Sequence, residues 1–488
     1  CCVIADPHEI ANVCGIEGIK FMIEDASRTP LKIYFMIPSC VPATSLETSG
    51  AKIGLKEIEE LKRMEQILGL GEVMNFPGVI KGEEEVMAKI KACKGMVIDG
   101  HAPGLRGEEL CRYIAAGINS DHESVTAEEA MEKLSLGMWV MIREGSTAKN
   151  LSDLASIVSP GSPERVMLVT DDQHAEDLLT KGHLDHVLRR AVEDGIDAVD
   201  ALRMVTVKPA EYFGLRSLGG ISPGKRANIV IVEDLERFKA EIVLIDGKIV
   251  AEKGRCLISI SSSAVKKAVK ETVHIEKLRP EDFIISYPEM GNETKVDEIV
   301  VRAIKVIPGQ IVTDETLCKL PVEKGKVLPD PQSDIIKICV VERHHGTGKM
   351  GRGFVKGFGL KNGALASTVA HDSHNIIAVG VSDFDICEAV NRLKEINGGL
   401  VAVSDGEVKS ELPLPIAGLM SDKGIEFVAK KMEKMNESAS DLGCKLRSPF
   451  MALSFLALPV IPKLKITDYG LVDVEKMELT ELFVSSSE

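Results

Sequence analysis

The first 205 residues alternate short apolar runs with stretches of helical periodicity, and this alternation restricts the fold more than any other feature. Seven runs have the length and composition of strands: Cys2–Ala5, Leu31–Ile37, Ile67–Met74, Gly95–Asp99, Ala116–Ser120, Met138–Ile142 and Val166–Thr170. Strands that alternate with amphipathic helices form a parallel sheet. The pattern therefore predicts an α/β fold, a (β/α)8 TIM-like barrel lacking its first strand.

The missing strand has an expected place. Strand number, shear and diameter are coupled in a closed barrel, so omission of one strand would leave two unpaired edges. The chain opens on Cys1, Cys2, Val3 and Ile4, inside a predicted strand and without an initiator Met. We therefore expect the first strand to precede residue 1, which makes this an N-terminally truncated copy.

The residue composition and the hydrophobic pattern of the sequence change twice after the barrel region. Residues 219–250 are rich in turn residues and alternating strands, with Asp246-Gly247 as a hairpin signal. From about Ser261 onward, mixed strands and helices are joined by Pro-containing connectors. We predict an incomplete barrel at 1–214, the remainder of a small β-sandwich domain at 215–260, and a C-terminal mixed α+β domain at 261–488.

Composition excludes several classes of function. With 74 acidic against 59 basic residues, the formal charge of -15 disfavours a nucleic-acid or anionic membrane surface. The 11 cysteines form no CxxC pair, which predicts free thiols and a cytoplasmic location. The apolar segment 450–461 is shorter than a membrane span and contains Pro459, so we expect it to be buried core.

Four of the strand-like runs end in residue types that bind metals. Glu72, His101, His122 and Asp171 stand at successive strand ends, where side chains converge in a barrel. A single strand-end histidine is usually structural, but four such positions in order favour a metal centre. Imidazole and carboxylate suit Mn, Fe or Zn, and two such ions lower the pKa of a shared water. The pattern predicts a binuclear metal hydrolase.

Longer blocks of sequence carry a family resemblance. The barrel pattern, the helix DALRMVTVKPAEYFGL and the tail GGISPGKRANIVIVED resemble the amidohydrolase superfamily. More narrowly, ADPHEIANVCGIEG, GLGEVMNFPGVI, DGHAPGLRGEEL, VTDDQHAEDLLTKGHLDHV and STVAHDSHNIIAVG resemble adenine deaminases of bacteria and archaea. The resemblance extends over nearly the whole chain. It implies hydrolytic deamination of adenine to hypoxanthine and ammonia at a binuclear Mn2+ or Fe2+ centre.

The resemblance also implies residue roles. Glu72 would bridge two metals, His101 and His122 would bind one of them, and Asp171 would bind the other and shuttle a proton. The family pattern further needs a His-x-His pair at the end of the first strand, and the sequence contains none. We expect that pair, like the strand, before residue 1.

Other polar residues lie close to these positions in sequence. His8 and Asp172 are candidate substrate contacts, although the segment around Asp6 and His8 fits a helix cap equally well. Glu123, which follows His122, is a candidate accessory acid/base. His183 and His186 have a spacing that binds metals on a helix, but a solvent-facing helix is the favoured interpretation.

Two motifs lie in the C-terminal region. His371, Asp372, His374 and Asn375 form a polar loop between apolar runs; His374 and Asn375 are candidate contacts to the purine, and a purely structural loop is nearly as well supported. The segment from Gly346 to Gly351 matches a GxGxxG fingerprint, but the Gly-rich stretch after it predicts a turn-rich β segment and no nucleotide site.

Adenine deamination is thus the expected enzyme activity, with adenine as the small-molecule partner, no nucleic acid, no membrane, and a homo-oligomeric state. A cyclic-amide hydrolase of the same superfamily is one alternative, although such enzymes usually carry a bridging Lys where Glu72 stands. A catalytically inactive fragment is the other, because the His-x-His pair is absent from the sequence.

Overall fold

The computed structural model describes residues 1–158, 161, 164–260, 267–287 and 297–484, which divide into two compact units. Unit 1 comprises residues 1–8, 19–40 and 53–264, and unit 2 comprises residues 9–18, 41–52 and 265–488. Two short N-terminal segments therefore belong to the same unit as the C-terminal region. The predicted domain boundaries at residues 214 and 260 stay predictions.

Unit 1 contains the seven predicted strands, all parallel to their neighbours. They are β1 (Cys2–Ala5), β2 (Lys32–Pro38), β3 (Ile67–Val73), β4 (Val97–Gly100), β5 (Ser120–Asp121), β6 (Trp139–Arg143) and β7 (Val166–Val169). They form two sheets, β1-β2-β3-β4 and β5-β6-β7, and in each sheet neighbouring strands are also consecutive along the chain. The alternating pattern predicted six of these strands closely, whereas the predicted strand Ala116–Ser120 overlaps β5 only at Ser120.

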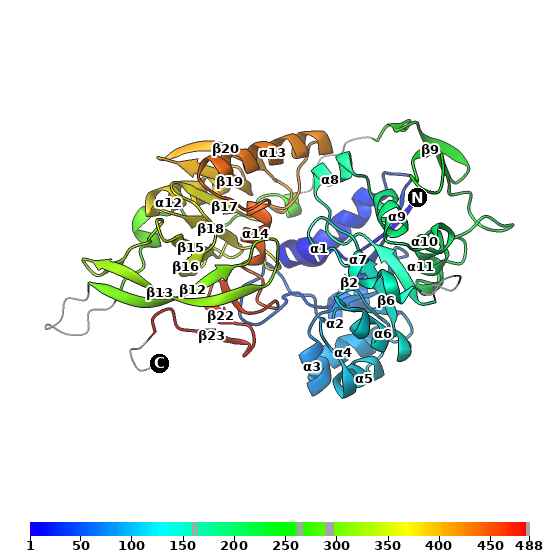
Figure 1. Cartoon of the computed structure of the whole chain (residues 1–488), viewed down its shortest axis with the longest axis horizontal. Coiled ribbons are helices and arrows are strands. Elements are labelled where there is room, and N and C mark those ends of the chain that lie inside the picture. Colours follow the sequence, from blue (N-terminus) through cyan, green and yellow to red (C-terminus); the bar gives the residue numbers. More distant parts are fainter. Residues whose placement is uncertain (159–160, 162–163, 261–266, 288–296, 485–488) are drawn as a thin grey trace. The chain divides into compact units, whose positions relative to one another are not determined.

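Helices follow the strands along the chain (Figure 1). They are α1 (His8–Ala26), α2 (Leu55–Leu61), α3 (Phe76–Lys81), α4 (Glu84–Ala92), α5 (Gly107–Ala115), α6 (Ala127–Ser135), α7 (Leu151–Leu154), α8 (Ala175–Thr180), α9 (Leu184–Glu193), α10 (Ala198–Val205) and α11 (Val207–Tyr212). Thr126 caps α6 by accepting the N–H of Glu129 at 3.3 Å. Val140 and Ile142 of β6 and Val187 of α9 belong to one buried apolar cluster of the unit.

A four-stranded antiparallel sheet completes unit 1. Its strands are β8 (Ile229–Val232), β9 (Ala240–Ile245), β10 (Lys248–Glu252) and β11 (Arg255–Cys256), paired in the order β11-β10-β9-β8. Asp246 and Gly247 form the β9–β10 turn with φ of 50° and 78°. Both angles are positive, as in the two-residue turns that match the right-handed twist of paired strands. The predicted hairpin is confirmed.

Unit 2 is built on a nine-stranded sheet of order β14-β13-β12-β16-β15-β18-β17-β19-β20. Its strands are β12 (Glu298–Val306), β13 (Thr313–Glu323), β14 (Lys326–Val327), β15 (Ile335–Val341), β16 (Met350–Lys356), β17 (Ala364–Ser367), β18 (Ile376–Gly380), β19 (Gly399–Ser404) and β20 (Glu407–Pro413); a small sheet holds β21 (Leu464–Thr467), β22 (Gly470–Asp473) and β23 (Glu478–Thr480). The GxGxxG segment runs into strand β16 and not into a helix, as predicted.

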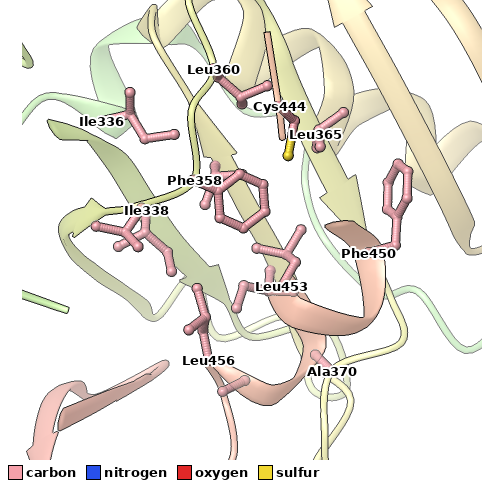
Figure 2. Close-up of a cluster of buried hydrophobic side chains, with 14 of the residues drawn as sticks. Ile336, Ile338, Phe358, Leu360, Leu365, Ala370, Cys444, Phe450, Leu453 and Leu456 are labelled. Atoms are coloured by element: carbon pink, nitrogen blue, oxygen red, sulfur yellow. The ribbon is translucent and has the colours of Figure 1, made fainter. Parts of the chain in front are cut away.

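Three helices cover this sheet: α12 (Asp383–Glu395), α13 (Ile425–Asp441) and α14 (Pro449–Phe455). Figure 2 shows Leu453 of α14 close to Phe358 in an apolar cluster that also contains Ile338 of β15 and Leu365 of β17. The apolar segment at 450–461 is thus buried core, as predicted. None of the helices in the described ranges is long and apolar enough to cross a membrane.

Candidate metal centre

Glu72, His101 and His122 converge at the carboxyl ends of β3, β4 and β5. One carboxylate oxygen of Glu72 lies 3.4 Å from His101 Nδ1 and 3.8 Å from His122 Nε2. The two imidazole rings meet edge to face with their centroids 5.1 Å apart. The three side chains offer ligand atoms within 4.8 Å of one another. Ligands held at ~2.0–2.2 Å by one ion are separated by about 3.0–3.5 Å, so this geometry fits a shared cation.

The backbone around two of these ligands is fixed by specific contacts. The β3–β4 register shifts between Leu70 and Val73, and Glu72 adopts a φ of 26° in this bulge. Bulges of this kind redirect side chains next to active sites. Tyr113 donates its hydroxyl to the carbonyl of Val73 at 2.7 Å and accepts the N–H of His101 at 3.0 Å.

A second group of three ligands shares Glu72. Asp6 follows β1, and its carboxylate lies 3.6 Å from His8 Nδ1; Asp6, His8 and Glu72 again offer atoms within 4.8 Å of one another. Helix α1 begins with Pro7 as its N-cap and no side-chain cap bond. Asp6 therefore does not cap α1, and the helix-cap interpretation of this segment is wrong.

Glu123 and Asp171 are held by Arg143, a residue that the sequence reasoning missed. The Arg143 guanidinium bonds to both oxygens of Glu123, one at 3.0 Å, and to Asp171 Oδ2 at 2.9 Å. Glu123 also lies 3.7 Å from both His101 Nδ1 and His122 Nε2. Arg143 ends β6, so a search of strand ends that included basic residues would have identified it.

Asp121 supports the loop that carries His122. Its fully buried carboxylate accepts the N–H groups of Ala102 and Glu123 at 2.9 and 3.1 Å and the Lys133 ammonium at 2.8 Å. Lys133 is itself fully buried and also pairs with Glu129. These contacts go to backbone and scaffold groups, so Asp121 fixes the path of the loop that carries His122.

The electrostatics of the cluster are those of a cation site. Burial alone would raise the pKa of Glu72, but His122, His8 and His101 lower it below its usual range. Burial would likewise lower the pKa of His101, yet the charges of Glu123 and Glu72 raise it to about 9. Carboxylates and imidazoles therefore stabilise one another's charged forms, and a divalent ion would replace the protons between them.

The remaining sequence candidates of unit 1 lie outside the two ligand groups. Asp171 and Asp172 follow β7, and Asp171 accepts the N–H of Asp172 at 2.8 Å. His183 is exposed and His186 partly buried, and neither belongs to a cluster of three ligands within the described residues. The metal role of Asp171 and the substrate role of Asp172 stay predictions.

Comparison with known proteins identifies the family to which this chain belongs. The amidohydrolase family model matches residues 2–250, and the adenine deaminase C-terminal domain matches residues 310–478. An adenine deaminase of Methanothermobacter thermautotrophicus is 51% identical over 481 residues, which are 98% of this chain and 86% of the relative. An adenine deaminase of Dehalococcoides mccartyi is 47% identical over 477 residues, which are 98% and 82% of the two chains. The chain belongs to the adenine deaminase family.

A solved structure of an adenine deaminase is more distant. It is 14% identical with a TM-score of 0.36, covering 51% of this chain and 77% of that chain. At this level the likeness carries no argument. The assignment to adenine deaminases, and with it the amidohydrolase barrel, rests on the sequence matches.

The adenine deaminase C-terminal domain includes the His371–Asn375 loop. Glu9 accepts from His371 Nδ1 at 3.0 Å and is in close contact with His374 Nε2. The backbone N–H of Ala370 donates to His374 Nδ1 at 3.1 Å. A backbone N–H can only donate, so the ring proton of His374 lies on Nε2 and points at Glu9. Glu9, His371 and His374 also offer ligand atoms within 4.8 Å of one another.

Asn375 is bound within unit 2 as well. Its amide donates to the carbonyl of Thr48 at 2.7 Å and accepts the N–H of Arg343 at 3.3 Å. His374 and Asn375 are both buried. These bonds give each side chain a structural role, and their contacts to a purine stay predictions.

Proposed function

We propose that this protein hydrolyses adenine to hypoxanthine and ammonia at a binuclear centre of Mn2+ or Fe2+. The observation that carries the proposal is the convergence of Glu72, His101 and His122 in a chain that matches adenine deaminases over 98% of its length. The donor set of imidazole and carboxylate suits these ions. When bound, such ions supply Lewis-acid activation of water.

The chain's own residues would then position and move protons. The reaction forms a C–O bond and breaks a C–N bond at the amino-bearing carbon of adenine, and the departing nitrogen must gain a proton. Glu123 and Asp171 are the carboxylates assigned to this transfer, because Arg143 holds both and Glu123 lies 3.7 Å from His101 and His122. Arg143 keeps the two acids in fixed orientations.

Substrate contacts by His8, Asp172, His374 and Asn375 remain part of the proposal. So do a cytoplasmic location, which the eleven free thiols favour, and a homo-oligomeric state. The adenine deaminase relatives and the matched C-terminal domain favour this activity over a cyclic-amide hydrolase.

The test is ammonia release from adenine by the chain reconstituted with Mn2+. We expect His101→Ala and Asp171→Asn to lower kcat by about 10²–10⁴-fold while the far-ultraviolet circular dichroism stays unchanged. His183→Ala, at an exposed position outside the cluster, is the matched control and should keep full activity. Near-normal turnover by either site variant, or no turnover by the wild-type chain, contradicts the proposal.

A further inference from the structure

Side chains join β4 to β5 where the backbone ladder is interrupted. The two strands belong to different sheets, and the backbone contributes a bond from the Asn119 N–H to the Ile98 carbonyl at 2.8 Å. The side chain of Asn119 accepts the N–H of Ile98 at 3.1 Å, and that of Asp121 accepts the N–H of Ala102 at 2.9 Å. Parallel strands are normally joined by evenly spaced backbone bonds. In this join, called the β4–β5 seam (residues 98–102 and 119–124), side chains replace some of them.

The carboxyl end of the seam coincides with two candidate metal ligands. Ala102 follows His101 in the chain, and Asp121 precedes His122. Asp121 Oδ1 accepts the N–H of Ala102 at 2.9 Å, and its Oδ2 accepts the N–H of Glu123 at 3.1 Å. A single carboxylate therefore binds the residue that follows each of the two histidines, and it connects their backbones across the seam.

Lys133 of α6 completes this connection. Its ammonium donates to the carbonyl of Ala102 at 2.9 Å, to Asp121 Oδ2 at 2.8 Å and to Glu129 Oε1 at 2.7 Å. The side chains of Lys133 and Asp121 are fully buried. Removal of either partner would leave an uncompensated buried charge, so the pair keeps its geometry. Ala102 is thus held by its N–H and by its carbonyl at once.

The seam therefore fixes the separation of two imidazole rings. The His101 and His122 centroids lie 5.1 Å apart, and the rings meet edge to face. Ligand distances in a metal site must be correct to about 0.2 Å. A small shift of either backbone would consequently change how well the two rings fit one ion. Groups that orient the ligands in this way affect metal affinity without touching the metal.

We propose that Lys133 and Asp121 are positioning residues that set the spacing of His101 and His122 for a divalent transition-metal ion. Neither is a ligand: Lys133 acts through the carbonyl of Ala102, and Asp121 acts through the backbone beside both histidines. The inference rests on the proposed function only in that an ion binds at this histidine pair.

The experiment measures Co2+ binding by the metal-free full chain. Imidazole and carboxylate ligands suit Co2+, and the visible absorption of the bound ion depends on the geometry of its ligands. Competition with a chelator gives the dissociation constant. We expect Lys133→Met and Asp121→Asn each to weaken Co2+ binding by about 10–100-fold. The absorption band of the ion that still binds should also shift, which a loss of stability alone would not cause.

Asp200→Asn is the matched control. Asp200 is likewise a buried carboxylate of unit 1, on α10, and it accepts a backbone N–H from Gly161 at 2.6 Å and the Arg203 guanidinium at 3.0 Å. Its bonds go to groups outside the β4–β5 seam. This variant should lose stability in urea but keep the Co2+ affinity and the absorption band of the wild type. Circular dichroism of each metal-free variant checks the fold.

Three results overturn the inference. The first is wild-type Co2+ affinity and absorption in a folded Lys133→Met or Asp121→Asn variant. The second is equal weakening in Asp200→Asn, since lost stability would then explain the effect. The third is failure of both seam variants to fold, because the pair would then hold the unit together and not the ligand spacing. If only one seam variant folds, that variant decides.

Ammonia release from adenine with Mn2+ is assayed separately. A wild-type chain that binds Co2+ but releases no ammonia refutes the proposed function, and weaker Co2+ binding in the seam variants still supports the inference. Ammonia release together with unchanged Co2+ binding in the seam variants gives the reverse outcome.

Discussion

The Arg143 guanidinium lies buried between Glu123 and Asp171 and bonds to both. Asn150 occupies its remaining donors at 3.2 and 3.1 Å. Removal of one partner from a buried ion pair leaves an uncompensated charge. In this site two carboxylates would face each other without the cation that separates them.

We therefore expect Arg143→Met to lower the free energy of unfolding by about 3–5 kcal/mol. The single tryptophan, Trp139, lies on β6 and reports urea unfolding of unit 1 by its fluorescence. Arg112→Met removes an exposed pair with Glu108 and should cost less than about 1 kcal/mol. Equal losses in the two variants would show that the buried network does not stabilise the barrel.

Glu47 gives unit 2 a pH dependence that can be measured. It is buried, and desolvation together with the negative charge of Asp372 raises its pKa from 4.5 to about 8. Between these two values the folded protein holds a proton that the unfolded chain has lost. Stability should therefore fall as pH rises through this window.

Glu47→Gln removes this titration. The variant should be more stable than the wild type at pH 8, by roughly 3–5 kcal/mol, and the difference should shrink toward pH 4. Denaturant unfolding followed by circular dichroism at several pH values measures it. A difference that does not change with pH would show that Glu47 is not the group that titrates.

Gly71 is the position where β3 leaves space for Asp6, which follows the end of β1. A methyl group there would collide with Asp6. We expect Gly71→Ala to cost about 1–3 kcal/mol in unfolding followed by Trp139 fluorescence. Gly220→Ala is the control, because the nearest atoms to its added methyl are 3.7 Å away in the flexible side chain of Lys225; its cost should stay within about 0.5 kcal/mol.

The strands of unit 1 were predictable because their apolar runs are local in sequence. Even so, the predicted strand Ala116–Ser120 overlaps β5 (Ser120–Asp121) only at Ser120, and Gly117 lies in the turn that follows α5 with a φ of 108°. Arg143 was missed because only His and acidic residues were sought at strand ends. The position of the Asp6 carboxylate beside Gly71 could not be predicted from the sequence. It depends on how the end of β1 lies against β3, which is two strands away in the sheet.

The same limit applies to the whole molecule. Residues 9–18 and 41–52 belong to unit 2 although they are separated from it by more than 200 residues. Hydrogen bonds link these segments to the rest of unit 2. Thr48 donates its hydroxyl and its backbone N–H to the Asp468 carboxylate at 2.6 and 2.9 Å, and the Asn375 side-chain amide donates to the Thr48 carbonyl at 2.7 Å. Local periodicity contains no information about such long-range pairs.

Because each unit has its own apolar core, metal binding should stabilise them unequally. The candidate ligands Glu72, His101 and His122 all belong to unit 1. A ligand that binds only the folded state stabilises it by about 2.7 kcal/mol at 100 times its dissociation constant. Amides of β1–β7 that exchange through unfolding of the unit should then exchange about 100-fold more slowly with Mn2+, and those of β15–β19 should not change. Hydrogen exchange measured by mass spectrometry tests this, with Glu72→Ala as the variant that should lose the protection. Equal protection in β15–β19 would mean that the two units unfold as one.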